Sequence, residues 1–75
     1  MKYKKYIERN PKVMLGKPVI KGTRITVEHI IRKLSSGYTI SDLLENYPHL
    51  TKVQISAALE FAADMIAHEE TLEKM

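Results

Sequence analysis

Two helix starts separated by a short turn constrain the fold of this chain more than any other feature. Thr39 is followed three residues later by Asp42, and Thr51 is followed at the same interval by Gln54. This spacing is that of a capping box, in which two side chains satisfy the free backbone amides of a first helical turn. The sequence therefore predicts two helices with only residues 48–50 between them. Such a pair is typical of a helix-turn-helix.

Apolar residues at helical spacing extend this to three helices. The first is expected over residues 27–35, with Thr26 as its N-cap and Gly37 as a left-handed C-terminal cap. The third has no internal Gly or Pro and is expected to continue to about Thr71. The core stripes are Val27, Ile30, Ile31 and Leu34, then Ile40, Leu43, Leu44 and Tyr47, then Ile55, Leu59, Ala62 and Ile66.

A short β element is expected before the helices. Aliphatic residues at 13–15 and 19–20 flank Gly16, which suits the positive φ of a type II′ hairpin turn. Pro18 cannot donate a ladder hydrogen bond, so the pairing would be at an edge or irregular. Residues 1–12 form a basic arm that is either extended or frayed.

We therefore expect a single mainly α domain, a three-helix bundle with a homeodomain-like helix-turn-helix preceded by a short β-hairpin or extended arm. Its parts are the arm at residues 1–12, the β element at residues 13–25 and the helical bundle at residues 26–75.

The formal net charge of +3 conceals a strong division along the chain. Residues 1–33 carry ten basic and two acidic residues, a net of +8, whereas residues 34–75 carry two basic and seven acidic residues, a net of −5. A basic first half suits a polyanion or an acidic protein surface as its partner.

Several function classes lack the residues they need. The absence of Cys excludes a disulfide framework, a thiolate metal site and a thiol nucleophile, and fits a reducing compartment. His68 begins a zinc-like motif but has no second His four residues later. No apolar run approaches the roughly 20 residues of a membrane span. We expect a cytoplasmic protein with no enzymatic activity, no cofactor, no metal and no membrane association.

The start of the third helix carries the residues best suited to DNA, because a helix-turn-helix reads bases from there. Gln54 suits an adenine edge and Lys52 a phosphate or a guanine, with Ser56 beside them. With Ile55 at the centre of the core face, steps of about 100° place the following residues outward: Val53, Ala57, Glu60 and Asp64. The two acids would face phosphates with the wrong sign, so readout is limited to the first turn.

Two of the basic or titratable positions, His49 and Arg24, each have two interpretations. His49, in the turn, could touch a phosphate, although a turn His is more often solvated or capping. Arg24 follows a turn and could reach a phosphate or an acidic partner, or could equally hold the arm on the bundle through backbone carbonyls. Lys17 and Lys21 add charge to the same segment.

Phe61 and Met65 form a second apolar stripe on the third helix. They are either the wider edge of the core or a docking surface for another protein.

Four segments together are more specific than any single motif: GTRI at residues 22–25, GY at residues 37–38, YPHLT at residues 47–51 and AALEFA at residues 57–62. Through them, residues 16–62 resemble the small bacterial and cyanobacterial family catalogued as domain of unknown function four-three-three. The resemblance implies a homeodomain-like helix-turn-helix and the antitoxin role of a type II toxin-antitoxin pair, usually beside a PIN-like ribonuclease.

The leading hypothesis is a non-enzymatic antitoxin that binds a PIN-like toxin and, as a homodimer, its operator DNA. The alternative is a protein-protein interaction module that does not bind DNA. A PIN-type active site gathers acids around metal, so the basic segment is a reasonable way to occlude it. Strand-mediated dimerisation through the hairpin edge and residues 3–7 is attractive, with disorder of the arm as its alternative.

Overall fold

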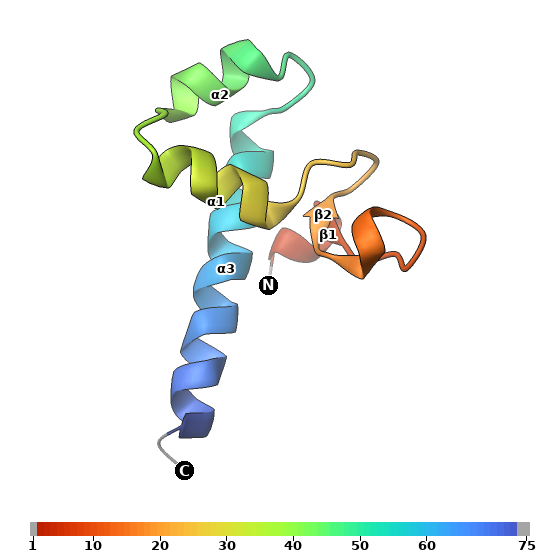
Figure 1. Cartoon of the computed structure of the whole chain (residues 1–75), viewed down its shortest axis with the longest axis vertical. Coiled ribbons are helices and arrows are strands. Elements are labelled where there is room, and N and C mark those ends of the chain that lie inside the picture. The colour runs from red at the N-terminus through yellow and green to blue at the C-terminus, as the bar shows by residue number, and fades with distance from the viewer. Residues whose placement is uncertain (1, 74–75) are drawn as a thin grey trace.

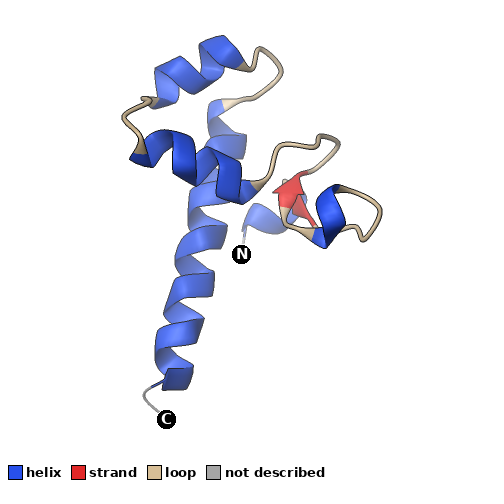
Figure 2. Ribbon diagram, in the orientation of Figure 1, coloured by secondary structure: helices blue, strands red, loops and turns tan. Residues whose placement is uncertain are grey.

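The computed structural model describes residues 2–73 as three α-helices preceded by a short antiparallel hairpin (Figures 1 and 2). This arrangement confirms the expected fold class. Within these residues, none of the helices combines the length and the continuous apolar surface that crossing a bilayer requires. The elements are the 3-10 turn η1 (Lys2–Lys5), β1 (Ile7–Glu8), the 3-10 turn η2 (Met14–Gly16), β2 (Val19–Ile20), α1 (Val27–Ser35), α2 (Ile40–Asn46) and α3 (Lys52–Glu73).

Both predicted capping boxes are present. Thr39 Oγ1 accepts from the Asp42 amide at 3.0 Å, and Asp42 Oδ2 accepts from the Thr39 amide at 2.8 Å. Thr51 and Gln54 exchange the same two bonds at 3.2 and 2.8 Å. The chain therefore enters α2 and α3 in the way that the sequence predicts, with a short turn between them.

Helix α1 has the predicted bounds because both ends are capped. Thr26 Oγ1 accepts from the amide three residues later at 2.9 Å. Gly37 has a φ of 107° and donates to Leu34 O at 3.2 Å, while the Tyr38 amide donates to Lys33 O at 3.1 Å. These two bonds form a Schellman motif, which turns the chain sharply into α2.

The hairpin exists, but its strands differ from those expected. The register pairs Ile7 with Ile20 and Glu8 with Val19. Met14 and Leu15 have φ of 49° and 59° and belong to η2, so residues 13–15 cannot form the partner strand. The predicted hairpin turn at Gly16 is wrong, since β2 pairs with the segment assigned to the arm.

Residues 3–8 pack onto α3 as part of the bundle. Tyr3 and Tyr6 are half-buried against the core. The Tyr3 ring meets Phe61 edge-on with 5.3 Å between centroids. Ala57, expected to face outward, is buried and lines the same small hollow as both tyrosines. That expectation is wrong because η1 covers this side of α3.

The core is formed by the hairpin, α1, α2 and the first half of α3. On α3 the core contains both Ile55 and Ala58, which are fully buried, and it extends past Ala58 to Ala57. Leu59 is 37% exposed and Ile66 is 58% exposed, so their expected core positions are wrong. The buried face is turned because η1 packs on one side of α3, and the second half of α3 extends past the bundle (Figure 1). The largest fully buried side chains are Val19, Ile20, Ile30, Leu43 and Ile55.

Candidate partner-binding and nucleic-acid interfaces

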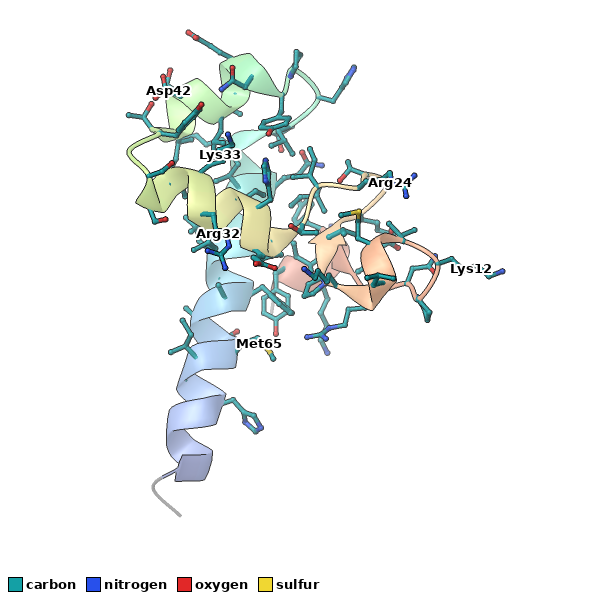
Figure 3. The ribbon with its side chains drawn as sticks, viewed as in Figure 1. Lys12, Arg24, Arg32, Lys33, Asp42 and Met65 are labelled. Atoms are coloured by element: carbon teal, nitrogen blue, oxygen red, sulfur yellow. The ribbon has the colours of Figure 1, made fainter. Side chains whose placement is uncertain are left out.

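Three cationic side chains surround one open hollow beside the hairpin. Lys12, Lys17 and Arg24 line a space of about 330 Å³. Figure 3 shows Arg24 and Lys12 directed away from the helices on the same side of the molecule. Arg24 is exposed and makes no hydrogen bond or ion pair among the described residues, so the suggested role in holding the arm is not observed. Its guanidinium is available for a carboxylate or a phosphate.

An exposed apolar loop projects beside these cations. Leu15 is 92% exposed and Met14 is 40% exposed, and both line the same hollow. Their left-handed backbone is held by bonds from the Gly16 amide to Val13 O and from the Lys17 amide to Met14 O, each 3.1 Å. A left-handed conformation costs an ordinary L-residue roughly 1–2 kcal/mol. Strain of this kind is concentrated at ligand-binding sites, which makes the loop a candidate contact. We call Lys12, Met14, Leu15, Lys17 and Arg24 the basic loop cluster.

An exposed ion network connects the cluster to α1. Glu28 Oε1 accepts from Lys17 Nζ at 3.2 Å, and Glu28 Oε2 accepts from Arg32 Nε at 3.0 Å. The hydrogen bond from Arg32, followed by the bond from Lys17, lowers the pKa of Glu28 below its ordinary value of 4.5. One carboxylate thus serves two cations, which leaves net positive charge on this side. Lys21 is exposed but does not line the hollow.

The residues predicted to contact DNA have different environments. His49 and Lys52 are exposed around the start of α3, as a phosphate contact requires. Ser56 is exposed at the edge of the hollow lined by Tyr3. Gln54 uses its Oε1 in the α3 cap, so only its amide NH₂ is free. The bidentate contact to adenine needs both groups and would break the cap.

A half-buried pair that the sequence did not indicate links α1 to the end of α2. His29 Nε2 lies 2.6 Å from Tyr47 Oη, and the two rings meet edge-on. Tyr47 and Arg24 line one hollow of about 230 Å³, so the basic loop and the turn before α3 are neighbours. In the sequence, Tyr47 lies 18 positions after His29 and 23 positions after Arg24, and no periodicity in the chain relates these residues.

Phe61 and Met65 line one groove but differ in exposure. Phe61 is half-buried, with the Tyr3 ring on one side and the Arg9 guanidinium 5.7 Å from its centroid. Met65 is 40% exposed, and Figure 3 shows it on α3 below Arg32 of α1. Phe61 therefore closes the edge of the core, and Met65 continues onto open surface.

Lys12, Met14, Leu15 and Arg9 were missed as site residues. Lys12 and Arg9 were noted only as part of the basic first half of the chain. The left-handed loop that presents Leu15 has no sequence signature, because neither Met nor Leu favours that conformation. Burial of Phe61 under Arg9 also depends on the pairing of β1 with β2, which the sequence did not predict.

A small helix-turn-helix bundle with an N-terminal hairpin and a basic loop is the class defined by these features. The chain belongs to the family described as "Protein of unknown function (DUF433)", whose model matches residues 7–62. A crystal structure of a DUF433 member protein from Anabaena variabilis ATCC 29413 is similar, with a TM-score of 0.78 and 29% identity, covering 92% of this chain and 68% of that one. No curated protein matches the chain.

Proposed function

We propose that this chain is a non-enzymatic antitoxin that neutralises a PIN-like ribonuclease and, as a homodimer, binds operator DNA. The basic loop cluster is the observation that carries the proposal. An exposed Leu15 with Lys12, Lys17 and Arg24 around it suits an acidic cleft with an apolar wall. The family resemblance supplies the expectation of a toxin partner.

The DNA-binding half rests on a smaller surface. His49 and Lys52 are exposed at the turn, and Arg24 lies beside the turn through the hollow shared with Tyr47. These three cationic or titratable groups suit phosphates rather than base edges. Glu60 is exposed further along α3 and opposes a longer contact with DNA.

Co-expression with the ribonuclease encoded beside this chain tests the antitoxin half. The chain should restore growth and co-purify with the ribonuclease, and Arg24→Glu should abolish both effects while Lys52→Glu retains them. If the neighbouring gene is not toxic, the antitoxin half fails.

Titration of the DNA upstream of the gene at several salt concentrations tests the other half. Each phosphate contact contributes about −0.9 to the slope of log affinity against log salt. Lys52→Glu should weaken binding and flatten the slope. A weak, salt-independent response in the unmodified chain would instead favour the alternative, a protein-protein interaction module that does not bind DNA.

A further inference from the structure

An open groove of about 660 Å³ lies in the corner between α1 and the second half of α3. Val27 and Ile31 of α1 line one wall, and Phe61, Met65 and Ile66 of α3 line the other. Exposed fractions of 40% for Met65 and 58% for Ile66 leave this wall largely uncovered. Apolar surface of this shape accepts an amphipathic helix.

The rim of the groove selects an acidic occupant. Arg9, Lys17 and Arg32 stand around it with one acid, Glu28. Glu28 already accepts from Lys17 and Arg32, so the rim retains a net charge of two positive units. A helix that enters should therefore carry carboxylates beside its apolar side chains.

The second half of α3 meets this description. It continues for eleven residues beyond Ala62 to Glu73, a length of roughly 16 Å at about 1.5 Å per residue, close to the roughly 13 Å of α1. Figure 1 shows this part of α3 extending past the other elements. The sequence from residue 63 to residue 75 contains four acidic residues and one Lys. Its apolar residues include Met65 and Ile66.

We propose that two copies of this chain pair their α3 helices antiparallel, so that the end of each α3 occupies the groove of the other copy. A twofold axis between Met65 and Ile66 makes the contact self-complementary, because Met65 of each copy lies opposite Ile66 of the other. Arg9, stacked over Phe61 at the rim, would then face the acidic end of the α3 of the other copy.

A stable interface removes about 800 Å² per partner, roughly one seventh of the 5607 Å² accessible surface of the chain. This interface deepens the homodimer of the proposed function, but it does not depend on a toxin or on DNA.

Sedimentation equilibrium of the full chain tests the pairing without either partner. The chain should have twice its mass of 8.6 kDa at about 100 μM. Met65→Glu places two carboxylates beside the axis and should raise the dimer dissociation constant at least tenfold. Val53→Glu, at a residue 54% exposed outside the groove, should leave the constant unchanged.

A charge reversal separates pairing from folding. Arg9→Glu replaces a cation at the rim of the groove with an acid, so it should weaken the dimer while the circular dichroism spectrum stays unchanged. A monomeric unmodified chain, a dimer insensitive to Met65→Glu, or a dimer insensitive to Arg9→Glu would each overturn the proposal. A dimer that survives Met65→Glu but dissociates when Ile7→Pro removes the β1 donor would show strand-mediated pairing instead.

Discussion

The hydroxyl of Tyr47 lies 2.6 Å from Nε2 of His29 and ties the end of α2 to α1. Tyr47→Phe removes the hydroxyl and leaves a part-buried ring nitrogen without this partner. A bond of this kind is worth about 1 kcal/mol, so we expect the free energy of unfolding in urea to fall by that amount. Tyr38→Phe is the control, because the Tyr38 hydroxyl makes no hydrogen bond among residues 2–73. Equal losses in both variants would contradict this role.

Because Ala58 is buried on α3 and Ala63 is exposed, we expect a larger side chain to destabilise the fold at Ala58 and not at Ala63. Ala58→Leu should overpack the core around this fully buried position and lower the free energy of unfolding by about 1–3 kcal/mol. Ala63→Leu adds the same atoms at an exposed position of the same helix and should change it little. Thermal unfolding followed by circular dichroism gives both values. If Ala63→Leu were the more damaging change, the orientation of α3 described above would be wrong.

Gln54 should matter to folding more than to base recognition. Its Oε1 accepts from the Thr51 amide at 2.8 Å, so Gln54→Ala removes half of the capping box and should cost about 0.5–1 kcal/mol. Ser56→Ala, two positions later and exposed, should leave the stability unchanged. Urea titrations of the two variants measure the difference. An unchanged stability together with altered sequence preference in DNA binding would return Gln54 to a readout role.

The Glu28 carboxylate should stabilise the fold at neutral pH and not in acid. Its pKa is lower in the folded chain than its ordinary value of 4.5, chiefly through the Arg32 hydrogen bond. The contribution is therefore complete above pH 4.5 and is lost as the pH falls through the lowered pKa. Glu28→Gln should be less stable than the unmodified chain at pH 7 and equal to it at about pH 2. Glu45→Gln, an exposed carboxylate without an ion pair among the described residues, should match the unmodified chain at both.

The left-handed conformation of Leu15 predicts a conflict between stability and binding. Leu15→Gly relieves the strain and should raise the free energy of unfolding by up to about 1 kcal/mol. Leu15→Ala removes the side-chain atoms beyond Cβ but keeps Cβ and therefore the strained backbone, so it should leave the stability unchanged. Both variants should bind the ribonuclease more weakly. Stabilisation without weaker binding would remove Leu15 from the interface.

Local signals in the sequence predicted the helices well. Thr39, Thr51 and Gly37 act through backbone groups within a few residues, so their spacing is sufficient to place α1, α2 and the start of α3. The predicted strand pairing was wrong because the partner of β2 is β1, more than ten residues earlier. The expected local partner at residues 13–15 instead leads into η2. Non-local pairing leaves little local signature.

The orientation of α3 and the candidate site were harder to predict for a related reason. Tyr3 and Tyr6 cover Ala57 from the other end of the chain, which rotates the buried face toward Ala58. The basic character of Lys17 and Arg24 made them candidates from the sequence. Lys12 joins them around Leu15 only because the chain makes a left-handed turn there. Tertiary contacts determine the orientation of α3 and the make-up of the candidate site, and these contacts cannot be predicted from the spacing of residues along one helix.

Inhibition of the proposed PIN-like ribonuclease partner in a purified RNA cleavage assay tests the central claim most directly. The unmodified chain should suppress cleavage, and Arg24→Glu should lose at least tenfold in inhibitory potency because it reverses an exposed cation of the basic loop cluster that makes no ion pair among the described residues. Lys52→Glu makes the same charge change on α3 and should inhibit like the unmodified chain. Equal inhibition by Arg24→Glu and the unmodified chain, or none by either, would contradict the account.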